Sequence, residues 1–202
     1  MTPWLTVVIP TIGRQTLEDT LTSLRVQPES DNLEVLVVAD THGPVNAQLN
    51  YSHKRVEDLG YDWLELDAGV NCVGQPQRTY GAKAANAPWV WFTQDDNIAA
   101  EQSLAIIKAA IAHQAHPRPM FFQMQTYWGA RIWQTPHLTQ GNIDADCLVF
   151  PRDIAREVEW GLRYEGDLDA AMRAFNLTGG DVAWVDELVS VGRPAVKQIW
   201  WR

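Results

Sequence analysis

The sequence predicts an α/β fold, a mostly parallel central sheet flanked by helices, built as a single domain over residues 1–202. Three observations predict it. Short apolar runs end on polar residues, as strands buried on both faces do, and stretches with helical periodicity separate these runs. The order strand, helix, strand, helix requires right-handed crossovers between parallel strands. A chain of this length buries a substantial core as one domain.

The first half of the chain alternates strands and helices. Residues 5–9 (LTVVI) form an apolar run that ends at Pro10, and residues 16–25 carry leucines at helical spacing. Residues 33–40 (LEVLVVAD) are a second buried strand. Residues 61–67 (YDWLELD) alternate like a strand nearer the sheet edge.

A turn-rich loop leads into the next helix and strand. Pro76 suits the first turn of a helix that runs to about Asn86. Because this helix is rich in Gly and Ala, we expect it to pack closely against the sheet. Residues 88–93 (PWVWFT) are the next strand, and residues 100–115 form an amphipathic helix.

The second half is less regular. Residues 120–125 (MFFQMQ) indicate a strand, and residues 127–133 (YWGARIW) indicate a strand or an aromatic loop. Helices are predicted over 152–160 and 166–175. Residues 182–191 (VAWVDELVSV) are strand-like.

Composition limits the function. Hydrophobic residues make up 46% of the chain and the net charge is −9, which is typical of a globular protein and argues against tight non-specific binding to nucleic acid or anionic membrane. Cys72 and Cys147 have no metal-like spacing and are expected as reduced thiols. We see no signal peptide and no apolar stretch of about 18 residues, so we expect a cytoplasmic protein with no membrane partner.

The polar ends of the predicted strands are the candidate site. In an open parallel sheet, ligands bind outside the carboxyl ends of the strands. A glycine-rich dinucleotide fingerprint and a phosphate-binding loop are both missing, so a metal is the natural phosphate binder. In chain order, the strand ends present Pro10 and Thr11, Asp40 and Thr41, and Gln94, Asp95, Asp96 and Asn97.

The order of three segments, TVVIPTIGR, LEVLVVAD and GQPQRTYGAKAANAPWVWFTQDDN, resembles the family-2 glycosyltransferases, which have the glycosyltransferase-A (nucleotide-diphospho-sugar transferase) fold. The likeness covers about residues 5–100. It implies a nucleotide-sugar-binding half over residues 1–100 and an acceptor-binding half over residues 101–202. The implied activity is transfer of a sugar from a nucleoside diphosphate, a UDP-sugar first, to a hydroxyl.

The resemblance also assigns residues to the donor. Pro10, Thr11 and Asp40 would hold the base and ribose, with Arg78 beside them. The family motif at the end of the next strand is Asp-x-Asp, and here its first position is Gln94. We place Gln94 among the donor-binding residues as well.

Asp95 and Asp96 are the predicted metal ligands, and Asp95 is also counted with the donor contacts. Residues two apart on an extended segment share a face, so Asp96 would point with Gln94 unless the chain turns at 94, which lets both carboxylates reach one ion. Mn²⁺ or Mg²⁺ needs only one or two protein carboxylates and stabilises a leaving diphosphate. The alternative is that Asp95, Asp96 and Asn97 cap the helix beginning near residue 100. The order of the upstream segments favours the metal.

A second acidic stretch lies in residues 163–175 (RYEGDLDAAMRAF). By resemblance to inverting members of the family, Asp167 is the best match to the general base, and Glu165 is the next. The alternative, that these acids are ordinary partners of a helix dipole, stays open.

The acceptor is not specified by the sequence. A polysaccharide, a metabolite, a protein or a hydroxymethylated base in phage DNA would each serve, and nucleic acid enters only as that modified-DNA acceptor. Tyr127, Trp128 and Trp133 either line an acceptor cleft or pack as a satellite core. Two rival functions stay open: a non-catalytic nucleotide- or sugar-binding module, which Gln94 favours, and a nucleotidyltransferase.

Overall fold

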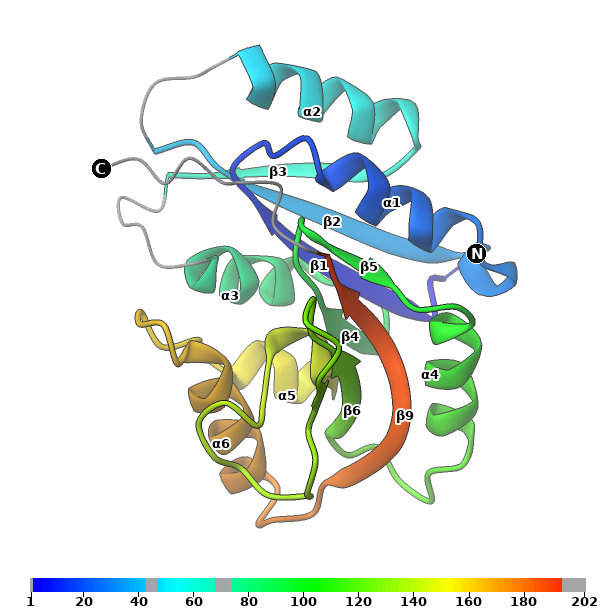
Figure 1. Ribbon diagram of the computed structural model, residues 1–202, viewed down its shortest axis with the longest axis vertical. Coiled ribbons are helices and arrows are strands. Elements are labelled where there is room, and N and C mark those ends of the chain that lie inside the picture. The colour runs from blue at the N-terminus through cyan, green and yellow to red at the C-terminus, as the bar shows by residue number, and fades with distance from the viewer. Residues whose placement is uncertain (1, 43–46, 68–73, 194–202) are drawn as a thin grey trace.

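The computed structural model describes residues 2–42, 47–67 and 74–193, and it shows a curled sheet with helices on both faces (Figure 1). The strands are β1 (Leu5–Thr11), β2 (Leu33–Asp40), β3 (Asp62–Leu66), β4 (Trp89–Phe92), β5 (Asn97–Ala99), β6 (Met120–Gln125), β7 (Arg131–Ile132), β8 (Leu148–Pro151) and β9 (Ala183–Gly192). The helices are α1 (Leu17–Arg25), α2 (Ala47–Asp58), α3 (Gln75–Ala84), α4 (Ser103–Ala112), α5 (Arg152–Glu157) and α6 (Gly166–Leu177), with short 3₁₀ turns η1 (Pro28–Ser30) and η2 (Ala145–Cys147).

The strands join in the order β3-β2-β1-β4-β8-β6-β9-β5, and β7 pairs with β6. The first four strands of this order are parallel to one another. Strand β8 runs antiparallel to both of its neighbours, β4 and β6, whereas β9 runs parallel to β6. The carboxyl ends of β1, β2, β4 and β6 therefore lie at the same edge of the sheet.

The prediction of a mostly parallel sheet is confirmed only in part, because the sheet is mixed. The parallel half follows from the crossover helices that the sequence shows. The antiparallel half depends on β8, a four-residue strand in a stretch where we predicted none. Because no α-helix separates β6 from β8 in the chain, β8 can return antiparallel to β6 and fill the place between β6 and β4.

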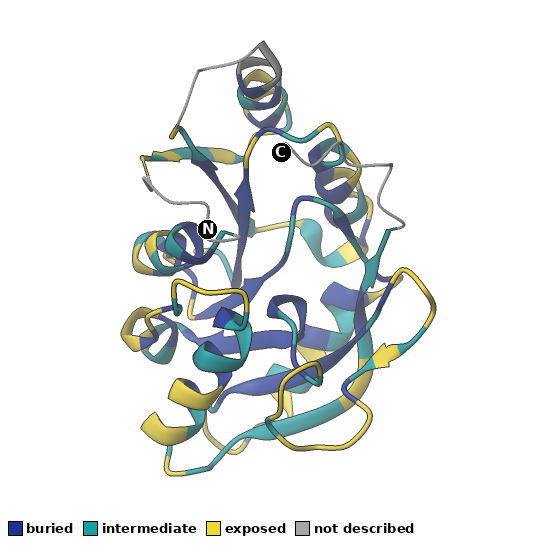
Figure 2. Ribbon diagram, turned by 60° about the vertical axis from the view of Figure 1, so that its left-hand side comes forward, coloured by how far each residue is buried: buried dark blue, intermediate teal, exposed yellow. Residues whose placement is uncertain are grey.

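The central strands are largely buried (Figure 2). Their alternate side chains belong to two separate apolar cores, one on each face of the sheet. Val8 of β1 belongs to the core under α3, α5 and α6, while its neighbours Val7 and Ile9 belong to the core under α1, α2 and α4. This alternation explains why the strands read as continuous apolar runs, since both faces are covered.

The close packing expected for the Gly- and Ala-rich helix is confirmed. Gly81 of α3 faces β1 so tightly that a Cβ atom there would lie 2.5 Å from Cγ1 of Val8. A glycine at this position lets α3 approach the sheet, and the helix N-terminus then lies over the strand ends that were predicted to form the site.

The remaining elements differ from expectation mainly in the second half and at boundaries. Helix α2 and strands β5 and β8 were not predicted, and α4 begins at Ser103 rather than near residue 100. The stretch 127–133 divides into a tight turn and the short strand β7. Cys147 is a buried free thiol, and Cys72 lies outside the described residues. In the part of the chain that the structure describes, no helix is both long and apolar enough to span a bilayer.

Candidate functional site

The site begins where β1 and β4 end side by side. Thr11, the last residue of β1, donates its Oγ1 hydrogen to Oδ2 of Asp95 at 2.6 Å, and the same Oγ1 accepts from the backbone N–H of Gly13 at 3.0 Å. The two strand ends are thus joined by side chains as well as by the ladder between β1 and β4. The expectation that these polar ends meet at one edge is confirmed for Thr11 and Asp95.

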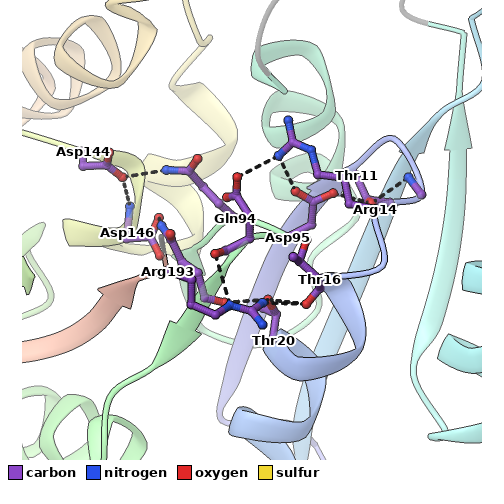
Figure 3. A network of polar contacts seen from close by, with 12 residues as sticks. Thr11, Arg14, Thr16, Thr20, Gln94, Asp95, Asp144, Asp146 and Arg193 are labelled. Carbon is purple, nitrogen blue, oxygen red and sulfur yellow. Dashed lines mark hydrogen bonds and ion pairs between the residues drawn. The ribbon is translucent and has the colours of Figure 1, made fainter. Parts of the chain in front are cut away.

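The acidic turn, residues 94–97, connects β4 to β5 and brings two carboxylates to one cation (Figure 3). A single nitrogen of Arg14, Nη1, donates to Oδ1 of Asp95 at 2.8 Å and to Oδ2 of Asp96 at 3.0 Å. Gln94 points elsewhere, to Asp144. The chain therefore turns at 94, and the adjacent carboxylates converge rather than lying on opposite faces.

The helix-cap interpretation of the acidic turn is wrong. Helix α4 begins at Ser103, and its N-cap residue is Gln102, which makes no side-chain capping hydrogen bond. The acidic turn is instead followed by β5, whose Asn97 pairs with Gly192 of β9. The two carboxylates therefore have no role in starting the helix.

The two carboxylates differ in exposure. Asp95 is 3% exposed, and burial raises the pKa of its carboxyl, although Arg14 and the hydrogen bond from Thr11 oppose the rise. The side chain of Asp96 is 30% exposed. Asp95 is therefore the inner residue that fixes the turn, and Asp96 presents its carboxylate outward.

The carboxylates of Asp95 and Asp96 suit a cation that a bound ligand also coordinates, not a cation that protein groups enclose. Both oxygens of Asp95 already accept hydrogen bonds, whereas Asp96 has one oxygen engaged with Arg14. Within the described ranges, no group of three or more His, Cys, Asp or Glu residues is arranged to hold a metal. Mg²⁺ and Mn²⁺ are commonly bound by one or two carboxylates together with substrate phosphates. Asp96 suits that arrangement.

Behind the acidic turn lies a fully buried carboxylate, Asp146 of η2. It is 0% exposed and accepts from Oγ1 of Thr93 at 2.7 Å, from Oγ of Ser190 at 2.6 Å and from Nδ2 of Asn97 at 3.0 Å. Its backbone carbonyl accepts from the indole of Trp91 at 2.9 Å. Thr93 directly precedes the acidic turn and Asn97 is its last residue, so Asp146 holds the turn at both ends.

Asp144 is hydrogen bonded to the side chain of Gln94. Its Oδ1 accepts from Nε2 of Gln94 at 2.9 Å and from the backbone N–H of Asp146 at 3.1 Å. Burial, reinforced by the neighbouring carboxylates of Asp167 and Asp146, raises the pKa of Asp144 well above its ordinary value. Gln94, expected among the donor contacts, is thus engaged in a contact within the protein.

Asp167, the predicted base, lies in the first turn of α6. It accepts from Nε2 of Gln75 at 3.3 Å. Burial raises its pKa, and the nearby charge of Arg78 and the nearby backbone of Ala145 oppose the rise. Glu165 is placed differently, because its Oε1 accepts from Gln140 in the loop before η2. Of the two candidates, Asp167 is the one that reaches the residues behind the acidic turn.

The other predicted donor residues lie around the N-terminus of α3. Arg78 is 2% exposed, and its guanidinium lies over the ring of Trp160, with Cζ 5.1 Å from the ring centroid. Gly74, at φ +83°, leaves no room for a Cβ, which would lie 2.7 Å from Cβ of Pro10 and 3.1 Å from Nη1 of Arg78. Pro10 and Arg78 are thus brought together, as predicted. Asp40 ends β2 and accepts from the backbone N–H of His42 at 2.9 Å.

Sequence reasoning missed Arg14, Asp144 and Asp146, and it did not rank Arg193 among the basic residues that could meet phosphate. Arg193 follows β9 and donates from Nε to the carbonyl of Asp96 at 3.4 Å and from Nη2 to the carbonyl of Thr16 at 2.6 Å, which ties the acidic turn to the start of α1 (Figure 3). One signal was available: Arg14 follows a predicted strand end that neighbours two acids. The other three depend on pairings of β8 and β9 that the sequence does not reveal.

The three aromatic residues of 127–133 are divided between surface and core. Tyr127 and Trp128 are 58% and 67% exposed and lie edge to face with ring centroids 4.4 Å apart, whereas Trp133 is buried. Their turn adjoins the acidic turn. A Cβ built on Gly192 would lie 3.1 Å from the backbone nitrogen of Tyr127 and 3.5 Å from Oδ1 of Asn97. Core packing therefore describes Trp133 and not the other two.

Comparisons with known proteins give a fold and no family. No protein-family model matches the sequence, and no curated protein matches it. Among solved structures, S. aureus TarS superposes with a TM-score of 0.70 at 16% identity, over 95% of this chain and 37% of that one. TarS 1–349 in complex with UDP-GlcNAc gives 0.72 at 17% identity, over 95% and 58%. The complex with UDP gives 0.70 at 15%, over 95% and 60%.

This chain thus spans between about a third and three-fifths of the length of the TarS chains that it matches. At such low identity the likeness concerns the path of the backbone. Since 95% of this chain is covered, the mixed sheet and its helices are shared almost throughout. The chain has the fold of TarS.

Proposed function

We propose that the chain is a glycosyltransferase that moves a sugar from a nucleoside diphosphate, a UDP-sugar first, to a hydroxyl acceptor. The observation that carries the proposal is the convergence of Thr11, Arg14, Asp95 and Asp96 at the carboxyl edge of the parallel strands. The fold supports it, because solved structures of TarS, which share this fold, are complexes with UDP-GlcNAc and UDP.

In this proposal the donor lies across the ends of β1, β2 and β4. Pro10, Thr11 and Asp40 hold the base and ribose, and Arg78 lies beneath them next to Pro10. The proposal keeps the division into a donor half, residues 1–100, and an acceptor half, residues 101–202. Backbone amides of a glycine-rich loop play no part in it.

Asp96 would hold Mn²⁺ or Mg²⁺, with Asp95 as the inner carboxylate of the pair. When bound, the ion supplies positive charge to the oxygens of the leaving diphosphate. Arg14 lies within 3.0 Å of both carboxylates and adds a fixed positive charge at the same point. Asp95, held by Thr11 and Arg14, orients the turn rather than meeting solvent.

Asp167 would be the general base of an inverting transfer, with Glu165 as the second choice. The acceptor oxygen forms a bond to the anomeric carbon, the bond from that carbon to the diphosphate oxygen breaks, and the acceptor proton passes to the Asp167 carboxylate. A pKa raised by burial suits this role, because a base works best when its pKa approaches the working pH.

The exposed pair Tyr127 and Trp128 supports a carbohydrate acceptor. Sugar rings stack on flat apolar rings, and this pair stands on a turn stabilised by hydrogen bonds from Gly129 N–H to Thr126 O at 2.9 Å and from Thr126 N–H to Ala130 O at 2.7 Å. A neutral saccharide also suits a chain with a net charge of −9 better than polyanionic DNA does.

A non-catalytic sugar-nucleotide-binding module is the second candidate. Two observations favour it: Gln94 replaces the first acid of the motif, and Arg14 already neutralises the two acids that remain. This candidate predicts nucleotide binding without any effect of a divalent cation, and no transfer.

A thermal-shift screen of UDP-, GDP-, TDP- and CDP-sugars, with and without Mn²⁺, tests the proposal and separates it from the second candidate. A ligand at about 100 times its dissociation constant adds about 2.7 kcal/mol, which is readily measured as a rise in Tm. We expect a rise with one class of nucleotide sugar that requires Mn²⁺. A rise independent of the cation would support the binding module, and no rise with any compound would refute both.

A further inference from the structure

We propose that the bridge segment, residues 144–146, positions the acidic turn relative to Asp167, and that the hydrogen bond from Gln94 to Asp144 is its adjustable contact. This inference rests on the proposed function, in which the acidic turn meets the donor and Asp167 meets the acceptor. Gln94, Asp144 and Asp146 are then positioning residues that act through the groups they hold.

The three residues of the bridge segment each contact a different part of the site. Asp146 accepts from Thr93 and Asn97, the residues on either side of the three central turn positions. Asp144 accepts from Gln94 within the turn. Burial raises the pKa of Asp167, and the backbone of Ala145 lies close enough to its carboxylate to oppose the rise. One short segment is therefore hydrogen bonded to the acidic turn and lies beside the proposed base.

The anchor of the bridge segment is unusually complete. The carboxylate of Asp146 is 0% exposed and accepts three side-chain hydrogen bonds, the third from Ser190 of β9. Buried polar groups that are fully paired are rigid, because every small displacement leaves a donor or acceptor unpaired. The bridge segment can therefore hold the acidic turn at a fixed position relative to Asp167.

The contact with Asp144 requires a hydrogen-bond donor at position 94, and an acidic side chain there would not supply one. Nε2 of Gln94 lies 2.9 Å from Oδ1 of Asp144. A carboxylate at position 94 would place two acids at that distance, and like charges so close in a buried site repel strongly. The departure from the Asp-x-Asp motif therefore has a physical reason in this chain: Asp144 already places an acid at this point, and residue 94 must donate a hydrogen bond to it.

Positioning has a distinct kinetic consequence. Donor affinity depends on the ends of β1, β2 and β4, and the hydrogen bonds of the bridge segment reach the end of β4, through Trp91 and Thr93, rather than β1 or β2. The chemical step depends on the relation between the donor and the base, and a displacement of about 1 Å in such a relation can cost about 100-fold in rate. A fault in the Gln94–Asp144 contact should therefore lower kcat much more than it weakens donor binding.

The test is a swap of isosteric side chains: Gln94→Glu, Asp144→Asn and the double variant. Asp144→Asn keeps an oxygen that accepts from Gln94, so kcat should stay within about threefold of wild type. Gln94→Glu should lower kcat about 10- to 100-fold at about pH 8, with the donor Kd changed less than about threefold. In the double variant the introduced amide at position 144 faces the introduced carboxylate at position 94, which should recover at least about tenfold of any 100-fold loss.

Gln15→Glu is the matched control. Gln15 is exposed and adjoins Arg14, so the variant adds the same charge near the site without facing Asp144. Its kcat should equal that of wild type. Melting temperatures of all variants exclude unfolding as the cause, and if Gln94→Glu fails to fold, the double variant compared with Asp144→Asn measures the same contact.

Each outcome of these measurements either supports or contradicts the positioning role. The positioning role is wrong if Gln94→Glu is as active as wild type, if the double variant is no better than Gln94→Glu, or if Asp144→Asn alone loses as much as Asp167→Asn, which would place Asp144 among the reacting groups. A wild-type chain that binds no nucleotide sugar would instead refute the proposed function, and the melting temperatures would still report whether Gln94 and Asp144 are coupled.

Discussion

Two acidic clusters lie on either side of Gln94, and they handle negative charge in opposite ways. Asp95 and Asp96 share a cation from the chain itself, Arg14, at 2.8 and 3.0 Å. The hydrogen bonds that Asp144 and Asp146 accept from the described part of the chain come instead from neutral donors, the amide of Gln94 among them.

This difference in hydrogen-bond partners indicates which chemistry each cluster suits. Carboxylates beside a guanidinium stay ready to exchange one cation for another and to meet a diphosphate. Burial raises the pKa of Asp95 as well, but Arg14 opposes that rise, whereas the neighbouring carboxylates of Asp167 and Asp146 reinforce the rise at Asp144. The first cluster therefore suits charge binding, and the second suits proton transfer. The following predictions test that division.

Asp167→Asn should have the largest effect. An amide cannot take the proton of the acceptor, so kcat should fall by about 10²- to 10⁴-fold, the usual contribution of a general base. Donor binding, measured by calorimetry, should be unchanged. Glu165→Gln is the matched comparison and should cost little, since Glu165 contacts Gln140 instead. Equal losses in both variants would remove Asp167 from its role.

Arg14→Met should have the next largest effect, on stability. It leaves the buried carboxylate of Asp95 without its cation, and an unpaired buried polar group costs about 1–3 kcal/mol in the free energy of unfolding. Urea denaturation measures this. Mn²⁺ should restore part of the loss, because the two carboxylates are then free for it. Arg55→Met, at the half-exposed pair with Glu18, should cost about 0–1 kcal/mol.

The smallest effect is a pH dependence at Asp144. The folded state holds the proton of Asp144 to a higher pH than the unfolded chain does, because its pKa is raised. The resulting stability is present below the ordinary pKa of an aspartate and is lost as the pH rises through the raised value. Asp144→Asn cannot ionise, so its Tm relative to wild type should increase between about pH 4 and pH 8. A constant difference would show that Asp144 titrates normally.

The two clusters also differ in how much of each could be predicted from the sequence. Thr11 and Asp95 were expected to meet because each follows a strand with an unmistakable apolar run. Arg14 was not, since its position depends on the loop at Gly13, where φ is +80° and a Cβ would lie 2.9 Å from Cα of Leu49 of α2. Sequence patterns do not show such contacts between a loop and a distant helix.

The second cluster was only half visible from the sequence. Asp167 stood out by resemblance in a helical stretch. Asp144 and Asp146 lie in an irregular segment and reach the site because β8 pairs with both β4 and β6. A strand of four residues carries too little periodicity to be recognised. The mixed topology, and with it the bridge segment, therefore emerges from tertiary packing.

In the proposed function, the acidic turn binds the donor diphosphate through a cation. Isothermal titration of UDP in the presence of Mn²⁺, into wild type and Asp96→Asn, tests it most directly. We predict binding to wild type and an affinity at least about tenfold lower, equivalent to about 1.4 kcal/mol, in a variant whose Tm is unchanged. Equal affinity in the two proteins would contradict the claim.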